Sequence, residues 1–432
     1  MGKYIIEGRK KMIGECDVQG AKNSALPILA ATVLAKGTCV IHNCPKLSDI
    51  VATINILEYL GCKVKREGHT VIVDSTGVNR HDIPDKLMHE MRSSIVFLGA
   101  ILGRLGKASL SMPGGCEIGL RPIDLHLEAM RRFGVSISEE YARLECVCEK
   151  KPVGTEIALS FPSVGATENI MLLASTATGT TTILNAAREP EISDLADFLN
   201  RSGARIQGAG EGVIVIEGVP ELTACEHTVI PDRIVAATYL TAAAMTNGSI
   251  TLNNVIPAHV GPVIPVFEEA GCDVCIRGRN IQLTAPPRLS CVRSVRTMPY
   301  PGFPTDIQAP IMAMTTIAEG TSVIIETIFE SRYKHVSELL RMGAKIRVDG
   351  RMAVVEGVQS LTGAKLVTPD LRGGSALVLA GLAARGVTEL SAIKHIDRGY
   401  EDFEKTLSAL GAEIKRIDDE DEAYRKDYES AV

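Results

Sequence analysis

The sequence contains no tryptophan, and phenylalanine and tyrosine are so few that aromatic residues make up 4% of its 432 residues. Proteins that bind single-stranded nucleic acid stack the bases on aromatic side chains, so this scarcity argues against such a platform. An excess of basic residues is also missing, because the formal net charge is -6. We therefore expect no nucleic-acid partner.

Long apolar segments are absent as well. No run reaches the roughly 18 apolar residues of a membrane-spanning helix, and the opening segment MGKYIIEGRKKMIG lacks the apolar centre of a signal peptide. The 11 cysteines are scattered and show no zinc-site or disulfide spacing. We interpret them as reduced thiols and expect a cytoplasmic protein without a membrane partner.

A short phrase built around one glycine recurs six times along the chain. The glycines lie at positions 61, 134, 203, 271, 343 and 411, between 68 and 73 residues apart. Each follows an amphipathic segment, such as residues 50–59, and precedes a stretch of alternating apolar and polar residues. This pattern is typical of a helix that ends at a glycine and leads into a β-strand.

A second phrase, glycine followed by threonine or serine, comes before a predicted strand in four of the units, and looser copies occur at Gly106 and Gly386 in the other two. An alanine-rich segment that is apolar nearly all round precedes it each time, and a helix of that kind is expected to be buried. The six predicted buried helices span residues 24–35, 93–105, 166–177, 233–246, 307–318 and 375–384.

Six buried helices would crowd one core, whereas three in each of two domains give cores of ordinary size. We therefore expect an α/β protein with an N-terminal domain of residues 22–230 and a C-terminal domain formed by residues 1–21 and 231–432. The first strands should complete sheets of the C-terminal half. An acidic, solvated tail is expected from about residue 418.

The segment SMPGGCEIGLRPIDLH, residues 111–126, is rich in glycine and proline and is predicted to be a loop. It carries Cys116 and, within ten residues, Arg121, Asp124 and His126. A thiol beside cations on such a loop is partly ionised and can donate a proton. The alternative, a buried and inert thiol, stays open.

Polar residues gather at the start of each predicted buried helix: Lys22 and Asn23, Arg92, Ser163 to Gly165, Asp232 and Arg233, Asp306, and Arg372. Helix capping explains the serine and the aspartates. It does not explain the cations, which oppose the helix dipole, whereas a bound anion would. If the helices run parallel, their N-termini converge on one interdomain cleft for a phosphorylated or carboxylated substrate. Capping alone is the alternative.

Two further arginines, Arg332 and Arg398, lie in predicted loops. The default interpretation of an isolated arginine in a loop is a solvated surface side chain.

Five stretches resemble one known family. They are GAKNSALP at 20–27, PGGCEIGLRPIDLH at 113–126, PSVGATE at 162–168, NAAREPE at 185–191 and FPTDIQ at 303–308. The family is that of the UDP-N-acetylglucosamine 1-carboxyvinyltransferases, and the similarity runs from about residue 4 to 416. It implies two inside-out α/β domains, each of three βαβαββ units around buried helices.

The resemblance also implies an activity: enolpyruvate passes from phosphoenolpyruvate to the 3-hydroxyl of UDP-N-acetylglucosamine through a tetrahedral ketal, and phosphate is released. This is the first committed step of peptidoglycan synthesis. It implies two small-molecule substrates and neither a metal nor a dissociable cofactor.

Site residues follow from the same resemblance. Cys116 is expected to deliver a proton to the methylene carbon, to form a covalent phosphoenolpyruvate adduct and to be alkylated by fosfomycin. Asp306 is expected to take the proton of the sugar hydroxyl. The residues expected to bind phosphoenolpyruvate are Lys22, Asn23, Arg121, Arg372 and Arg398, with Lys22 and Arg398 also catalytic. The residues expected to bind the UDP-sugar are Asn23, Arg92, Arg121, Pro122, Ile123, Asp124, Leu125, Ser163, Val164, Gly165, Asp306 and Ile328.

The chain departs from the family pattern at Phe161, where some members have a lysine that contacts the diphosphate. Two other functions stay open. One is transfer of enolpyruvate to shikimate 3-phosphate, as in the sister family with the same six-unit architecture. The other is a paralogue that binds the UDP-sugar and regulates wall synthesis without catalysis.

Overall fold

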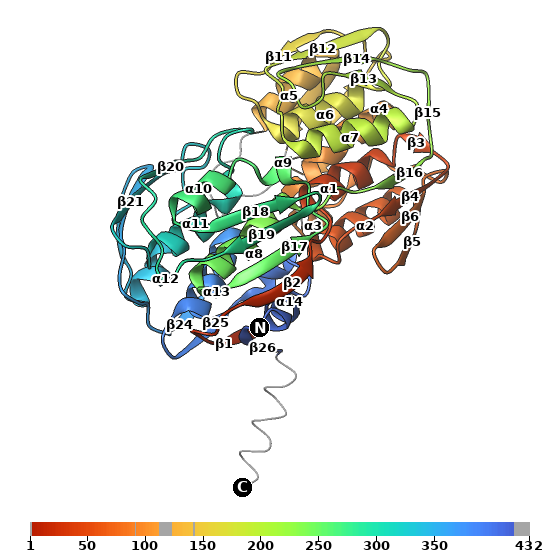
Figure 1. Ribbon diagram of the computed structural model, residues 1–432. Helices are drawn as coiled ribbons and strands as arrows, with labels where there is room; N and C mark the ends of the chain where they lie inside the picture. The colour runs from red at the N-terminus through yellow and green to blue at the C-terminus, as the bar shows by residue number, and fades with distance from the viewer. Residues whose placement is uncertain (1, 91, 112–122, 141–142, 419–432) are drawn as a thin grey trace. The chain divides into compact units, whose positions relative to one another are not determined.

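A computed structural model describes residues 2–90, 92–111, 123–140 and 143–418 (Figure 1). The chain divides into two compact units. We call residues 19–230 the middle unit, and residues 2–18 together with 231–418 the terminal unit. No helix in these described ranges is long and apolar enough to cross a membrane.

Within its described residues, the middle unit contains three four-stranded sheets and one two-stranded sheet. The strands are β3 (Ala35–Lys36), β4 (Thr38–His42), β5 (Lys63–Glu67), β6 (Thr70–Asp74), β7 (Asp82–Ile83), β8 (Lys107–Ser111), β9 (Val135–Glu140), β10 (Arg143–Cys148), β11 (Glu156–Ala158), β12 (Thr180–Leu184), β13 (Arg205–Gln207), β14 (Val213–Glu217), β15 (Leu222–Thr223) and β16 (Glu226–Thr228). The sheet orders are β16-β4-β6-β5, β7-β8-β10-β9, β11-β12-β14-β13 and β15-β3.

The terminal unit likewise has three four-stranded sheets among the residues described. Its strands are β1 (Lys3–Glu7), β2 (Ile13–Asp17), β17 (Ser249–Asn253), β18 (Asp273–Arg277), β19 (Asn280–Thr284), β20 (Ser294–Arg296), β21 (Thr321–Ile325), β22 (Lys345–Asp349), β23 (Met352–Glu356), β24 (Lys365–Val367), β25 (Val387–Ser391) and β26 (Glu413–Ile417). The orders are β18-β19-β17-β2, β20-β21-β23-β22 and β24-β25-β1-β26.

All six four-stranded sheets repeat one topology. A short edge strand runs parallel to a central strand, and two further strands follow antiparallel, as in β16 with β4, β6 and β5. The N-terminal strands join this scheme from the far end of the chain. Strand β2 pairs parallel to β17, and β1 lies between β25 and β26; in Figure 1 the red β2 lies beside the green β17.

Three largely buried helices form the centre of each unit. In the middle unit they are α1 (Lys22–Ala31), α4 (Phe97–Leu105) and α6 (Val164–Ala174), and in the terminal unit α8 (Arg233–Met245), α11 (Gln308–Thr315) and α13 (Leu371–Ala383). Helix α4 contacts both α1 and α6, while α8, α11 and α13 contact one another. Each unit has its own cluster of buried apolar residues. Helices therefore occupy the core and sheets surround them, as the inside-out arrangement requires.

The remaining helices lie nearer the surface. They are α2 (Ser48–Leu60), α3 (Asp85–Glu90), η1 (Arg92–Val96), α5 (Asp124–Arg132), α7 (Pro190–Arg201), α9 (Pro257–Val260), α10 (Ile264–Glu269), η2 (Thr305–Ile307), α12 (Val336–Arg341), η3 (Ile393–Arg398) and α14 (Phe403–Ala409).

Glycine ends a helix in all six units, as predicted. Gly61, for example, follows α2 with a φ of 105°, and the other five recurring glycines also have positive φ. A residue other than glycine would be strained in this left-handed conformation.

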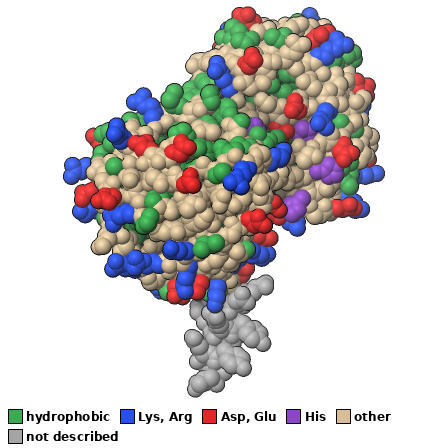
Figure 2. Space-filling view, viewed as in Figure 1, with side chains coloured by type: hydrophobic (Ala, Val, Ile, Leu, Met, Phe, Trp, Pro, Cys, Tyr) green, Lys and Arg blue, Asp and Glu red, His purple; other side chains and the backbone are tan. Residues whose placement is uncertain are grey.

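The buried helices begin and end at somewhat different residues than predicted. Helices α1 and α13 start two and four residues earlier than expected, so Lys22 and Arg372 belong to their first turns. Predictions of helix ends from sequence are generally the least reliable part of an assignment. Figure 2 shows charged side chains of both signs interspersed over the face in view, in keeping with the small net charge.

Candidate active site

Lys22 is the first residue of α1, and its ammonium group is buried rather than solvated. Its Nζ lies 2.6 Å from Oδ2 of Asp49 in the first turn of α2, and the two side chains are 9% and 3% exposed. A buried lysine needs such a partner, because an unpaired buried charge is costly. The sequence suggested a bound anion beside Lys22, and the Asp49 carboxylate of the chain itself supplies a negative charge at that position.

Hydrogen bonds to Asp194 of α7 and to Ile230 hold the backbone on either side of Lys22 in place. The Ser24 hydroxyl donates to Asp194, whose carboxylate also accepts from the Ile230 amide at 3.2 Å and lies 2.9 Å from Nε2 of His227. The Ala21 amide donates to the Ile230 carbonyl at 2.7 Å. These bonds fix the direction in which α1 presents Lys22 and Asn23.

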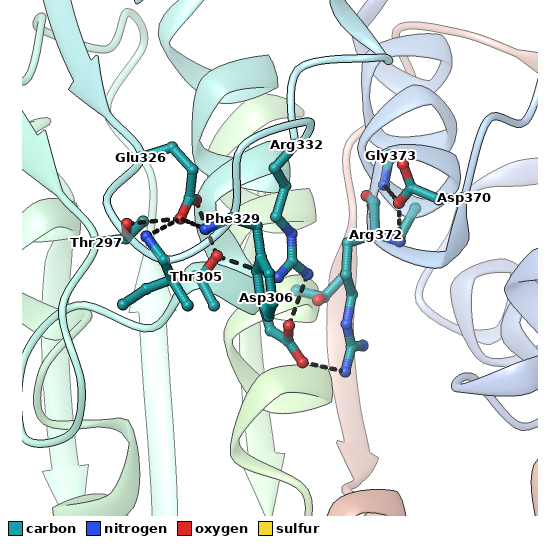
Figure 3. A network of polar contacts seen from close by, with 12 residues as sticks. Thr297, Thr305, Asp306, Glu326, Phe329, Arg332, Asp370, Arg372 and Gly373 are labelled. Atoms are coloured by element: carbon teal, nitrogen blue, oxygen red, sulfur yellow. Dashed lines mark hydrogen bonds and ion pairs between the residues drawn. The ribbon is translucent and has the colours of Figure 1, made fainter. Parts of the chain in front are cut away.

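A second charged cluster in the terminal unit centres on Asp306 of η2 (Figure 3). Arg332 places Nη2 at 2.6 Å from Oδ1 of Asp306, and Arg372 places Nη2 at 3.0 Å from Oδ2. Both arginine side chains are 4% exposed and the Asp306 side chain is 25% exposed. The interpretation of Arg332 as a solvated surface residue was therefore wrong.

The electrostatics of this cluster are dominated by the two guanidinium groups. Burial by itself raises the pKa of the Asp306 carboxyl, but Arg372 and Arg332 outweigh burial and hold that pKa well below its usual range. Asp306 also raises the pKa of Arg372 against the opposing effect of burial. All three groups are charged at neutral pH.

Glu326 lies behind Arg332 and organises the loop that follows β21. Thr297 and Thr305 donate their hydroxyls to Glu326 at 2.9 and 2.8 Å, and the Ile328 and Phe329 amides donate at 2.8 and 3.1 Å. The Ile328 amide is thus already engaged. Any contact of Ile328 with a ligand must use its carbonyl or its side chain.

Helix α13 begins with an aspartate cap, Asp370, that was not predicted from the sequence. Oδ1 of Asp370 accepts from the Arg372 amide at 3.0 Å and the Gly373 amide at 2.9 Å. Asp232 caps α8 and Ser163 caps α6 in the same way, as predicted. Asp306 directs its carboxylate to Arg332 and Arg372, so the alternative that this residue only caps a helix was wrong.

Arg398 is the last residue of η3, and the residue before it is clamped to β26. Arg416 donates through Nη1 and Nη2 to the two oxygens of Asp397, at 2.7 and 2.9 Å. A two-bond guanidinium–carboxylate pair of this kind restricts orientation as well as distance. The backbone that carries Arg398 is therefore anchored.

The start of α6 brings together three residues expected to bind the UDP-sugar. Ser163 is its N-cap, accepting from the Ala166 amide at 3.3 Å, and Val164 and Gly165 open the helix. Phe161, at the position of the missing lysine, is 43% exposed.

Asn169 joins α6 to its neighbours α4 and α5. Its side chain accepts from the Gly99 amide at 2.7 Å, donates to the Ile95 carbonyl at 3.0 Å and lies 2.8 Å from Nδ1 of His126. Burial lowers the pKa of His126 to about 4. His126 is thus neutral at physiological pH, and α5 is held with Asp124 and Leu125 in its first turn.

The structure brings Asp306 and Arg372 into contact and puts Lys22 and Asn23 side by side in α1. It does not describe Cys116, Arg121, Pro122 or the side chain of Arg92, so their predicted roles lie outside the described residues. Asp49, Arg332 and Asp370 were not predicted as site residues. The sequence signals for these residues are weak: Asp49 and Asp370 lie at helix starts, and Arg332 lies in a charged loop. Among the described residues, no group of three or more histidines, cysteines and carboxylates could hold a metal ion.

The chain is similar over nearly its whole length to one family model and to several named relatives. The sequence model of a family described as EPSP synthase (3-phosphoshikimate 1-carboxyvinyltransferase) matches residues 6–407. The UDP-N-acetylglucosamine 1-carboxyvinyltransferase 2 of Caldanaerobacter subterraneus is 54% identical over 96% of this chain and 100% of its own length. The chain belongs to the UDP-N-acetylglucosamine 1-carboxyvinyltransferase family. This confirms the resemblance found in the five sequence stretches.

Other relatives agree with this family membership. The UDP-N-acetylglucosamine 1-carboxyvinyltransferase 1 of Symbiobacterium thermophilum is 50% identical over 96% of this chain and 95% of its own length. The enolpyruvyl transferase NikO from Streptomyces tendae superposes with a TM-score of 0.87 at 25% identity, covering 96% of this chain and 99% of that one. EPSP synthase from Acinetobacter baumannii has a TM-score of 0.74 at 18% identity, covering 97% and 100%, and shows the fold alone. The predicted fold class is therefore confirmed.

Proposed function

We propose that this protein transfers the enolpyruvyl group of phosphoenolpyruvate to the 3-hydroxyl of UDP-N-acetylglucosamine and releases phosphate, the first committed step of peptidoglycan synthesis. The observation that carries the proposal is the 54% identity over essentially the whole length of a relative named for this reaction. The charged residues around Lys22 and Asp306 support it, because the reaction brings two strongly anionic substrates together.

In the addition step, the sugar hydroxyl gives its proton to Asp306, and its oxygen bonds to C2 of the enolpyruvyl group. Cys116 gives a proton to the methylene carbon, so the carbon–carbon double bond becomes a methyl group on a tetrahedral ketal. In the elimination step, the methyl group returns a proton to the Cys116 thiolate, the carbon–carbon double bond re-forms, and the bond between C2 and the phosphate oxygen breaks. Phosphate leaves with the proton that Asp306 took from the sugar hydroxyl, so both groups regain their starting protonation states.

Cations of the chain stabilise the phosphate and carboxylate of phosphoenolpyruvate. We assign this role to Lys22, Arg372 and Arg398, with Asn23 beside Lys22 and Arg121 contributing from outside the described residues. Lys22 and Arg372 already face carboxylates of the chain. They are held as charged groups before substrate arrives, which reduces the reorganisation that binding requires.

The start of α6 supports binding of the UDP-sugar diphosphate. This helix has 11 residues, and its first amides point outward with a partial positive charge. The remaining UDP-sugar contacts are assigned to Arg92, Ile123, Asp124, Leu125 and the carbonyl or side chain of Ile328.

We also place the protein in the cytoplasm. The cysteines of the described residues form no disulfide, and reduced thiols are typical of that compartment.

Transfer to shikimate 3-phosphate is the second candidate, because the matching family model carries that description. Phosphate release from phosphoenolpyruvate, measured with each acceptor in turn, separates the two. Release with UDP-N-acetylglucosamine alone supports the proposal. Release with shikimate 3-phosphate supports the second candidate, and release with neither, despite UDP-sugar binding, supports a regulatory paralogue.

A matched pair of lysine variants links the activity to the site. Lys22→Ala should abolish phosphate release, whereas Lys36→Ala should leave it unchanged, because Lys36 is 53% exposed and pairs with Glu221 at the surface. Near-normal turnover by Lys22→Ala would remove Lys22 from the site.

A further inference from the structure

Both oxygens of Asp306 are occupied by guanidinium groups, at 2.6 Å from Arg332 and 3.0 Å from Arg372. A carboxylate neutralised by two cations is a weak base. The role proposed for Asp306, taking the proton of a sugar hydroxyl, needs a more basic oxygen than this arrangement provides. One of the two arginines must therefore change partner before the reaction.

Arg332 is bound on two sides. Besides Asp306, its Nη1 donates to the Thr305 hydroxyl at 3.1 Å, and that hydroxyl donates to Glu326. Glu326 is 1% exposed and holds two backbone amides of the following loop. Figure 3 shows Arg332 between Asp306 and this group of residues. Displacing Arg332 would disturb the whole loop.

Arg372 has weaker additional partners. Its Nη1 donates to the Tyr400 hydroxyl at 3.2 Å, and its guanidinium carbon lies 5.5 Å from the centre of the Tyr400 ring. Both contacts are with an uncharged group. An incoming anion can compete for this guanidinium at a lower cost than for Arg332.

We propose that Arg332 is a positioning residue that holds one oxygen of Asp306 while Arg372 exchanges the second oxygen for an anionic group of phosphoenolpyruvate. The exchange leaves Oδ2 of Asp306 free to accept the hydroxyl proton of the acceptor. The O–H bond breaks, the proton goes to Oδ2, and the electron pair stays on the hydroxyl oxygen that attacks C2. Binding of one substrate thus activates the base for the other.

This inference rests on the proposed function. Because it predicts a pH dependence of the reaction, the other charged and titratable groups near Asp306 also have to be considered. The titratable and charged groups of the elements packed around η2 include Asp232, Arg233, Glu326, Arg332, Tyr333, His335, Asp370, Arg372 and Tyr400. In wild type, only the exchange of Arg372 changes the charge in direct contact with the Asp306 carboxylate.

The first test measures phosphoenolpyruvate binding to Asp306→Asn by titration calorimetry. The amide no longer competes for Arg372, so phosphoenolpyruvate should bind about tenfold more tightly than to wild type, although turnover is lost. A dissociation constant equal to or above that of wild type overturns the inference. A structural role alone for Asp306 predicts weaker binding.

The second test compares the pH dependence of kcat for Arg332→Gln and Arg332→Lys at saturating substrates. Loss of the cation raises the pKa of Asp306, so the acid limb of the Arg332→Gln profile should move to higher pH, and kcat should fall about tenfold with little change in the KM for phosphoenolpyruvate. Arg332→Lys keeps the charge and should recover part of both effects. An unshifted acid limb, or a rise in that KM at unchanged kcat, contradicts the assignment.

Arg341→Gln serves as the control, because this arginine is 53% exposed and its ion pair with Glu338 lies within one helical segment. Thr305→Val offers a milder test if Arg332→Gln folds poorly. It removes only the hydroxyl that connects Arg332 to Glu326 by hydrogen bonds. It should lower kcat with little change in the KM for phosphoenolpyruvate. If wild type releases no phosphate with UDP-N-acetylglucosamine, the proposed function fails. If wild type is active but Asp306→Asn binds phosphoenolpyruvate no more tightly, only this inference fails.

Discussion

Lys22 and Asp49 form a buried ion pair between the first turns of α1 and α2, with Nζ at 2.6 Å from Oδ2. The pair combines two functions that are usually hard to separate. It supplies a cation for an anionic substrate, and it removes the cost of keeping that cation away from water.

A double variant separates these functions. Lys22→Met alone leaves Asp49 buried without its cation, and the free energy of unfolding should fall by about 3 kcal/mol. Adding Asp49→Leu should restore most of that stability without restoring phosphate release. Urea unfolding and the phosphate assay on the same preparations test both statements. Recovery of activity in the double variant would show that Lys22 has no part in the reaction.

Protonation of His126 should contribute to the pH dependence of the free energy of unfolding. Its pKa in the folded protein is about 4, below the usual 6.5 of histidine. The unfolded chain therefore binds the proton more readily, and the stability present above pH 6.5 is lost as the pH falls towards 4. The loss should be about 2 kcal/mol between pH 7 and pH 5.

Urea unfolding at the two pH values measures this loss. His126→Gln should lose markedly less stability between them, because glutamine does not titrate. His89→Gln, a substitution at an exposed position, should behave like wild type. An equal loss in wild type and His126→Gln would exclude His126 as the source.

Arg416 should affect the binding of phosphoenolpyruvate indirectly, through the position of Arg398. Arg416→Gln breaks the two-bond contact with Asp397 and loosens the backbone before Arg398. We expect the KM for phosphoenolpyruvate to rise about fivefold, because misplacing a positioning group weakens binding, while the KM for the UDP-sugar changes little. Arg205→Gln, which removes an exposed ion pair with Glu217, is the control. Equal increases in both KM values would indicate a general loss of structure instead.

Cys116 lies outside the described residues, so its test rests on the sequence. Cys116→Asp keeps a group able to donate a proton and should retain turnover, but without a thiol it should escape alkylation by fosfomycin. Cys148→Ser, at a partly exposed cysteine of β10, should remain sensitive. Fosfomycin inactivation of Cys116→Asp would place the reactive group elsewhere.

The sequence predicted the fold well because its strongest signals are local. A helix that ends at Gly61 needs a residue that tolerates positive φ, and the same need recurs in every unit. Helices such as α8, whose residues 234–245 are all buried, show their location by the absence of a polar face. The expected pairing of the N-terminal strands with the C-terminal half was also confirmed.

The charged site was harder to predict because its partners are far apart in the chain. Arg332 and Arg372 reach Asp306 from 26 and 66 residues away. Nothing in the local sequence of Arg332 distinguishes it from a surface arginine. The unexplained cations suggested a bound anion, whereas for Lys22 and Arg372 the chain supplies a carboxylate. The expected roles of the site residues stay predictions.

Strand β1 lies near the N-terminal end of the described chain, but its partner strands β25 and β26 are made about 380 to 410 residues later. The middle unit has all of its strands as soon as residue 230 has been made, so it can fold while the rest of the chain is still in synthesis. Meanwhile β1 waits unpaired until β25 and β26 appear, because it lies between them. The last sheet of the terminal unit therefore forms only after β26 has been made, and it depends on β1 staying accessible until then.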